Sequence, residues 1–336
     1  MDWAETAFAG PAVLVTVAIV QGSGPREAGA KMLVTPERQI DTIGGGHLEL
    51  RAVEIARAML RDGRMGHLER FALGPSLGQC CGGVVHLAFE LADAAQAALL
   101  HERRLEDSWR LTALDGVAHS ALFDADGRQL SGAPAPAFDR AYGAHVMQEA
   151  DGRRWLVDPV LAPRAHLVLF GAGHVGAAIV RALAHLPCNV TWVDERDDMF
   201  SGDVPANVTV EASDIPEALV AAAPPGATYL VMTHSHALDQ RLTEAVMARA
   251  DVLWFGLIGS LTKRRQFEHR LRERGVDAGR IAAMVCPIGL PGISNKAPAV
   301  IAASVVAQLL TVWEQAAHAS AGVPGLRLVA SGKSHL

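Results

Sequence analysis

The sequence predicts an α/β fold in two parts, a strand-rich α+β domain in the N-terminal half and a doubly wound parallel sheet in the C-terminal half. Strand and helix patterns alternate after residue 164, and a glycine-rich turn joins the first of these strands to the first helix. The N-terminal half instead contains short apolar runs separated by turns. Such runs indicate many strands and few helices.

The first elements follow from local pattern. Residues 12–21 are almost continuously apolar and predict a buried strand. A turn at 36–39 separates two short apolar runs, which predicts a hairpin of 31–34 and 40–43. Gly44-Gly45-Gly46 then precedes a helix over 47–60, in which one face is apolar. The residues of that face are Leu48, Ala52, Ile55 and Met59.

The remainder of this domain is read in the same way. We expect strands at 68–73, 84–91, 109–114, 118–123, 144–148 and 154–157, and a helix near 93–105. Two prolines at 159 and 163 predict a short linker. The expected organisation is therefore an N-terminal domain over 1–160, a second domain over 164–316, and a loose C-terminal tail over 317–336.

The glycine-rich turn reads Phe170-Gly-Ala-Gly-His-Val-Gly176. Gly171 permits a tight turn, Gly173 lets the backbone approach a phosphate, and Gly176 lets the helix pack on the strand. The helix N-terminus offers free N–H groups to the same anion. Asp194 ends the next strand at roughly the 20-residue spacing expected of an acid that binds a ribose 2′-hydroxyl. Together these features predict a Rossmann unit.

The remaining elements complete this unit. We expect its strands at 166–171, 189–194, 207–211, 227–233, 252–258 and 281–285, and its last helix at 297–316. Apolar residues recur every four positions in the first and last helices, as expected for helices that cover a sheet. His174 lies inside the glycine turn and would reach the phosphate of a ligand.

Composition excludes several classes of partner. The 336 residues carry a net charge of −6, which gives no electrostatic reason to expect nucleic acid or an anionic membrane. No run of about 18 uninterrupted apolar residues predicts a membrane span, and the N-terminus does not resemble a secretory signal. Four cysteines do not make a disulfide scaffold and suggest a reducing, cytoplasmic setting. Oligomeric state stays open, although a homodimer is common.

Two adjacent thiols are a candidate chemical site. Gln79, Cys80 and Cys81 lie between glycines in a predicted loop. Thiolates are nucleophilic, bind soft metals and carry persulfide sulfur, so the loop is a candidate sulfur-handling site. The alternative is a tight turn with one buried and one exposed thiol. No Cys-x-x-Cys pair indicates zinc.

Two cations near glycine-rich turns suggest a second anion site. Arg26 follows Gly22-Ser-Gly-Pro, and Lys31 follows Gly29-Ala. With Gly44-Gly45-Gly46 they could form an anion pocket, but two solvated surface loops explain them equally well.

Strand ends in the second domain carry further candidates. His234 and His236, with Asp239 nearby, follow one predicted strand and could contact a ligand, bind metal or move protons. Gly259 and Ser260 follow another strand and could form a second wall of the same crevice. The chain has no Gly-x-Ser-x-Gly elbow, His-Glu-x-x-His helix or Gly-Lys-Thr loop, which disfavours the common hydrolases and kinases.

These segments together resemble the XdhC/CoxI family. The resemblance covers roughly residues 10–315 and is carried by Gly22-Ser-Gly-Pro-Arg26, Gly29-Ala-Lys-Met32, Thr42-Ile-Gly-Gly-Gly46 with Leu48-Glu49, Gly78-Gln-Cys-Cys-Gly-Gly83, Phe170-Gly-Ala-Gly-His-Val-Gly176, Thr233-His-Ser-His236, Gly256-Leu-Ile-Gly-Ser260 with Lys263-Arg264, and Cys286-Pro-Ile-Gly-Leu-Pro-Gly292. The Gln-Cys-Cys-Gly and His-Val-Gly elements in tandem are specific, whereas the glycine turn alone is not.

The resemblance implies a role as a chaperone rather than a turnover reaction. Such proteins bind the molybdenum cofactor, a molybdopterin, and support its sulfuration with a cysteine desulfurase. They then deliver it to the molybdenum-binding subunit of xanthine dehydrogenase. Under this interpretation the glycine turn holds the pterin phosphate, and Cys80 or Cys81 contacts the molybdenum.

Two other functions stay open at this stage. The glycine spacing and Asp194 also suit an NAD(P)-dependent oxidoreductase, although no catalytic acid–base pair can be assigned. A regulator that senses a dinucleotide is the third reading, since the linker permits domain motion. Adding NADH and candidate substrates, and titrating NAD(H) and molybdopterin in thermal shift, would separate these readings.

Overall fold

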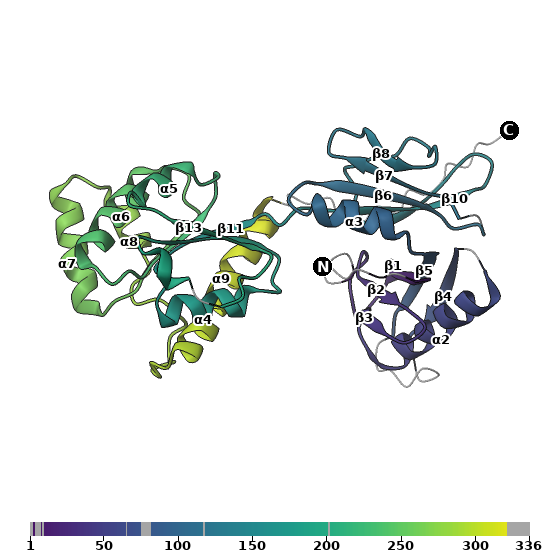
Figure 1. The fold of residues 1–336 in the computed structure, drawn as a ribbon, viewed down its shortest axis with the longest axis horizontal. Coiled ribbons are helices and arrows are strands. Elements are labelled where there is room, and N and C mark those ends of the chain that lie inside the picture. The colour runs from purple at the N-terminus through teal and green to yellow at the C-terminus, as the bar shows by residue number, and fades with distance from the viewer. Residues whose placement is uncertain are drawn as a thin grey trace. The chain divides into compact units, whose positions relative to one another are not determined.

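The computed structural model describes residues 3, 8, 10–64, 66–74, 82–116, 118–200 and 202–320. The chain divides into two compact units, Met1–Ala162 and Pro163–Leu336, coloured purple to teal and teal to yellow in Figure 1. The first unit is strand-rich and the second is a parallel sheet with helices, so the predicted fold class is confirmed.

The first unit contains two antiparallel sheets of five strands. One has the order β3-β2-β1-β5-β4 and the other β8-β7-β6-β10-β9. The first sheet comprises β1 (Val13–Gln21), β2 (Lys31–Val34), β3 (Gln39–Asp41), β4 (His67–Ala72) and β5 (Val84–Leu91). The second comprises β6 (Ser108–Ala113), β7 (Ser120–Asp124), β8 (Gln129–Gly132), β9 (His145–Gln148) and β10 (Arg154–Val160). Sequence analysis missed β8, which is short and carries no buried residue.

Among the described residues, the helices α2 (Gly46–Asp62) and α3 (Ala94–Glu102) accompany these sheets. The predicted apolar face of α2 is buried against the first sheet and forms one core with β1, β2 and β5. Gly63 ends α2 in the left-handed region, which suits a residue without a Cβ. Asp93 begins α3 by accepting the Ala95 and Gln96 N–H groups.

A buried ionic network holds the two sheets together. Lys31 on β2 lies 2.7 Å from Asp158 on β10. Arg110 on β6 bridges Asp158, at 3.0 Å, and Glu90 on β5, at 2.8 Å. Two cations and two anions thus neutralise one another at the junction of the sheets, as buried charges require.

The second unit is a parallel sheet of order β13-β12-β11-β14-β15. Its strands are β11 (Ala165–Phe170), β12 (Cys188–Asp194), β13 (Val208–Ala212), β14 (Thr228–Val231) and β15 (Trp254–Leu257). Its helices are α4 (His174–Leu183), the single-turn η2 (Asp197–Met199), α5 (Glu217–Ala222), α6 (His236–Ala248), α7 (Leu261–Glu273), α8 (Ala278–Ala283) and α9 (Pro298–Ser320). The strand order reverses between β11 and β14, and ligands of such sheets bind at the carboxyl ends of the strands beside this reversal.

Helices cover both faces of this sheet (Figure 1). Leu238 and Leu242 of α6 pack on one face with Phe267 of α7. On the other face α4 packs against α9, where Val305 and Leu309 are fully buried. Within the described residues, α9 is the one helix long and apolar enough to span a membrane by length and composition. Its buried face makes it part of this core.

Two sequence predictions in this unit were wrong. Residues 281–285 do not form a sixth strand, since α8 runs to Ala283 and only Val285 pairs with the sheet, through a bridge to Gly256. Asp277 accepts the Arg280 N–H at 3.1 Å and so starts a helix. A short apolar run is compatible with either a helix or a strand, and the sequence pattern alone does not distinguish them. Helix α9 continues to Ser320, so residues 317–320 are not loose, and 321–336 lie outside the described residues.

Candidate functional site

In the turn between β11 and α4, two glycines are required by packing and a third borders open space. Gly171 has φ 119°, and a Cβ there would lie 2.5 Å from the Met232 carbonyl oxygen. A Cβ on Gly176 would lie 2.1 Å from the Gly171 carbonyl oxygen. A Cβ on Gly173, by contrast, would meet no described atom within 4 Å. Packing therefore requires Gly171 and Gly176, whereas Gly173 borders open space into which a ligand can fit.

The first turn of α4 has no side-chain cap among the described residues. Gly173 is its N-cap and makes no side-chain capping bond, and His174 is its first residue. In contrast, Ser235 caps α6, Ser260 caps α7 and Asp277 caps α8. The first N–H groups of a helix attract anions, so the start of α4 is where a phosphate would fit.

Asp194 accepts four hydrogen bonds from the chain itself. Its Oδ2 accepts the Ala172 N–H at 2.8 Å and Arg196 Nη2 at 3.1 Å. Its Oδ1 accepts Arg196 Nε at 2.9 Å and the Arg196 N–H at 3.1 Å. Burial opposes ionisation, but the bonds from Arg196 and Ala172 outweigh it and hold the pKa of Asp194 below its usual range. A ribose hydroxyl, as predicted from the sequence, would have to displace one of these donors.

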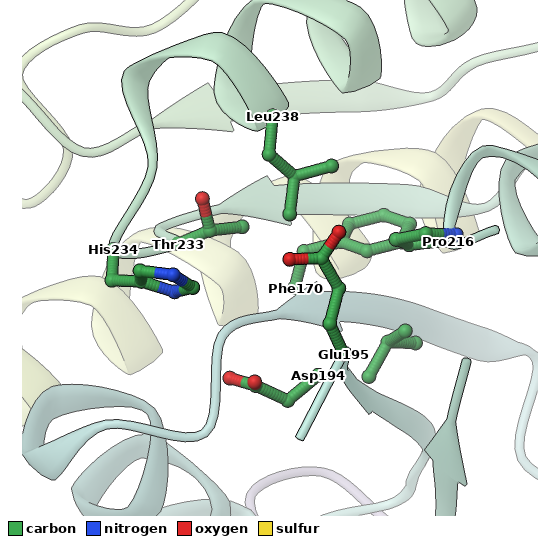
Figure 2. Close-up of a pocket in the computed structure, with 8 residues that line it drawn as sticks. Phe170, Asp194, Glu195, Pro216, Thr233, His234 and Leu238 are labelled. Carbon is green, nitrogen blue, oxygen red and sulfur yellow. The ribbon is translucent and has the colours of Figure 1, made fainter. Parts of the chain in front are cut away.

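A pocket lies at the carboxyl ends of β11, β12 and β14 (Figure 2). Its cavity volume is about 10 Å³, which is room for about one water molecule. Its lining residues are Phe170, Val193, Asp194, Glu195, Pro216, Thr233, His234 and Leu238. Figure 2 shows the Glu195 carboxylate turned toward Leu238, while the Asp194 carboxylate points elsewhere. Sequence analysis did not single out Glu195, although its place directly after a strand-end acid could have pointed to it.

The loop after β14 does not bring His234, His236 and Asp239 together as one site. His234 lines the pocket and is exposed, and the exposed His236 begins α6. Asp239 is instead buried, where it accepts Thr233 Oγ1 at 2.7 Å and Lys263 Nζ at 2.6 Å. No three His, Cys, Asp or Glu side chains among the described residues are placed to hold a metal ion. The possible metal site at this loop is therefore not formed.

Gly259 and Ser260 lie at the end of β15, as predicted, and support α7. The Ser260 hydroxyl accepts the Lys263 N–H at 3.3 Å. A Cβ on Gly259 would lie 2.5 Å from Lys263 Cδ, so glycine makes room for that buried side chain. Lys263 also donates to the Ile258 carbonyl at 2.8 Å.

The predicted anion pocket of the first unit is occupied by the chain's own carboxylates. Arg26 pairs with Glu27 at 3.0 Å and donates to the Thr42 carbonyl at 3.4 Å. The N–H groups of Ile43 and Gly45 both donate to Glu49, at 3.0 and 3.1 Å. Lys31 is buried in the ionic network, so it offers no exposed cation to a ligand. Sequence analysis quoted Glu49 within a motif but did not recognise this role.

Gln79, Cys80 and Cys81 lie outside the described residues. Cys188 and Cys286 are free and buried. Burial raises the pKa of Cys188 to about 11, so its thiol stays protonated at neutral pH.

A parallel sheet of this order, with a glycine turn after its first strand, defines a Rossmann-type domain, which in this chain follows a two-sheet domain. Residues 167–309 match the XdhC Rossmann domain, and residues 7–72 match the XdhC and CoxI family. The chain belongs to this family, and its membership implies an accessory role in molybdoenzyme maturation.

The chain is similar to a protein of Escherichia coli and to a solved structure from Bacillus halodurans. The uncharacterized protein YqeB of Escherichia coli K12 is 30% identical over 154 residues, which are 46% of this chain but only 28% of YqeB. The crystal structure of a xanthine dehydrogenase (BH1974) of Bacillus halodurans matches with a TM-score of 0.74 and 19% identity, over 96% of this chain and 97% of that one. The second likeness concerns the fold alone.

Proposed function

We propose that this chain is a molybdenum-cofactor chaperone. It holds a phosphorylated molybdenum pterin, supports its sulfuration by a cysteine desulfurase, and delivers it to the molybdenum-binding subunit of xanthine dehydrogenase in the cytoplasm. Family membership supports the accessory role. The observation that carries the cofactor assignment is the uncapped start of α4, where Gly173 borders open space.

The residues of the Rossmann unit supply binding and orientation. The N–H groups that begin α4 would bind the pterin phosphate, with the His174 imidazole beside them. His234 lines the small pocket at the ends of β11, β12 and β14. The bound group would supply a soft, sulfur-bearing molybdenum centre, and Cys80 or Cys81 are its candidate contacts.

The test measures whether the purified chain retains the cofactor and then whether it delivers the cofactor to apo xanthine dehydrogenase. The full chain is purified from a molybdenum-replete host, and the copurifying small molecules are identified by mass spectrometry. The purified chain is then added to apo xanthine dehydrogenase, and recovered activity is measured. Copurified molybdopterin and restored activity support the proposal, whereas NAD(P) as the sole copurifying ligand with no restoration contradicts it. A C80S/C81S double variant that retains the cofactor and still supports full sulfuration would remove the thiols from the proposal.

An NAD(P)-binding function is the second candidate, as an oxidoreductase or as a sensor. One observation favours it, because Asp194 lies at the end of β12 where an acid contacts ribose in such folds. Its four hydrogen bonds within the chain weigh against that contact. Thermal-shift titration with NADH, compared with molybdopterin, separates the two candidates, since only a bound ligand raises the unfolding temperature.

A further inference from the structure

A larger cavity lies in the first unit, at one end of its second sheet. Its volume is about 610 Å³, within the range of roughly 300–1,000 Å³ that small-molecule sites occupy. The end of β6, the connection from β6 to β7 and the turn between β9 and β10 form its wall. The lining residues are Ala113, Asp115, His119, Asp151, Gly152 and Arg153. The cavity therefore has room for a small organic molecule.

The two carboxylates in this wall are already engaged by the chain. One Asp115 oxygen accepts the Arg154 N–H at 2.5 Å, and the other accepts Arg154 Nε and Nη2 at 3.1 and 3.0 Å. The bonds from Arg154 hold the pKa of Asp115 below its usual range, so it stays ionised. Asp151 Oδ1 accepts the Arg153 N–H at 3.0 Å. Each carboxylate thus has a neighbouring arginine, and the four charges balance.

The Arg153 guanidinium, by contrast, has its donors unused. Its Nη2 lies 3.7 Å from Asp151 Oδ2, which is beyond hydrogen-bonding distance, and it donates to no other described residue. A guanidinium carries five N–H groups, whereas Asp151 Oδ2 is the one carboxylate oxygen in the described wall without a hydrogen bond. The wall therefore has more free donors than free acceptors. The Arg153 side chain is 48% exposed, so a ligand can reach it.

His119 is a second polar group of the wall. Its ring contacts the ring of Trp155, with centroids 5.4 Å apart, so the imidazole is held in place. Its Nε2 is buried and has no hydrogen-bond partner among the described residues. No acceptor at Nε2 therefore fixes the tautomer, and the ring can carry its proton on Nδ1 as a donor to a ligand.

We infer that this cavity binds a small organic anion, with its oxygens held by the Arg153 guanidinium. Carboxylates and phosphates both present the pair of oxygens that a guanidinium binds through two parallel N–H groups. Because the charges around the cavity balance, the preference for an anion comes from these directional bonds and not from a net positive field. The inference concerns the first unit alone and does not rest on the proposed function.

The experiment compares three probes on the full chain in equilibrium titrations: benzoate, phenyl phosphate and benzamide. They share a ring and differ in the attached group, which is a carboxylate, a phosphate or a neutral amide. We expect benzoate, phenyl phosphate or both to bind about tenfold or more tightly than benzamide, because charge-assisted bonds to a guanidinium are the stronger ones.

Variants then locate the bound anion. R153Q should weaken binding of the preferred anion by about tenfold, and R153K should weaken it less, since lysine keeps the charge but not the fork of donors. H119F keeps an aromatic ring beside Trp155 but has no ring nitrogen, so it should also weaken binding. R38Q is the matched control, because Arg38 is an exposed arginine in the turn between β2 and β3 and does not line the cavity.

The outcomes separate the two kinds of anion and test the site. Tighter binding of benzoate alone identifies a carboxylate ligand, and tighter binding of phenyl phosphate alone identifies a phosphate ester. Benzamide bound as tightly as the anions, or no binding of any probe, overturns the inference. So does unchanged anion binding in an R153Q chain whose circular dichroism matches that of the natural chain, or an equal loss in R38Q.

Discussion

Lys263 Nζ lies 2.6 Å from Asp239 Oδ2, and the two side chains are 11% and 1% exposed. The pair joins the start of α7 to the start of α6, because Asp239 is on the first turn of one helix and Lys263 on that of the other. The second Asp239 oxygen accepts both the N–H and the hydroxyl of Thr233, at 3.0 and 2.7 Å. This one buried carboxylate thus sets the conformation of the loop that carries His234.

K263A should destabilise the second unit strongly. The substitution leaves the buried Asp239 carboxylate without its counter-charge, which costs about 3–5 kcal/mol in comparable pairs. The measurement is urea denaturation followed by fluorescence of the second unit's tryptophans. R265A is the control, since Arg265 is an exposed cation on the same helix and its loss should change the free energy of unfolding by about 0.5 kcal/mol or less. Equal effects of the two substitutions would contradict the role of the pair.

Substitution by alanine should lower stability at Gly176 but leave it nearly unchanged at Gly173. A Cβ on Gly176 meets backbone at 2.1 Å, so G176A should lower stability by roughly 1–3 kcal/mol. G173A meets no described atom and should leave the unfolding temperature nearly unchanged. G173V should nevertheless reduce the retention of phosphorylated pterin about tenfold, because the added methyl groups occupy the approach to α4. Copurified pterin is quantified against protein; full retention by G173V would count against a phosphate at this turn.

The stability of the second unit should fall at acidic pH through Asp194. Its folded pKa is held below the ordinary value of 3.8, so its contribution is fully present above that value and is lost as the pH falls through the folded pKa. D194N should therefore be less stable than the natural chain at neutral pH, and the difference should shrink below about pH 4. Thermal unfolding across this range measures it. D203N, at an exposed site, serves as the control; a constant difference at every pH would show that Asp194 does not act through its ionisation.

Glu49 should control the glycine loop before α2. Its carboxylate accepts N–H groups from Ile43 and Gly45, and it also accepts the Thr42 hydroxyl. Since each hydrogen bond to a charged group contributes about 1.5–3 kcal/mol, E49A should open this loop. Hydrogen exchange of the Ile43 and Gly45 amides should accelerate by tenfold or more. E54A is the control on the exposed face of α2, where Glu54 pairs with Arg51 at 2.8 Å. The exchange rates of this variant at the loop should match those of the natural chain.

The local sequence pattern was sufficient to predict most of the helices and strands. The alternation of strands and helices predicted the parallel sheet, and the apolar spacing of α2 predicted its buried face, because both depend on neighbours in sequence. The same approach failed at residues 281–285, where a single capping aspartate outweighed an ambiguous apolar run.

At the candidate site, the sequence alone did not predict the hydrogen-bond and ion-pair partners of each side chain. The sequence predicted the glycine motif, the strand-end position of Asp194 and the position of His234 after a neighbouring strand. That Asp194 is saturated by Ala172 and Arg196, and that Lys31 is neutralised by Asp158, depends on atoms brought together by folding. Whether a charged side chain faces a ligand is decided by which groups already surround it, and these include groups distant in sequence, such as the Ala172 N–H at Asp194 and Asp158 at Lys31.

The sequence by itself thus determined the fold class, the glycine turn and the family resemblance, since these rest on short-range spacing. Only the tertiary structure decided which glycine borders open space and which charged side chains still have unused hydrogen-bonding groups. The physical reason is that hydrogen-bond satisfaction and burial are properties of a three-dimensional neighbourhood, to which β11, β12 and β14 contribute together at the pocket.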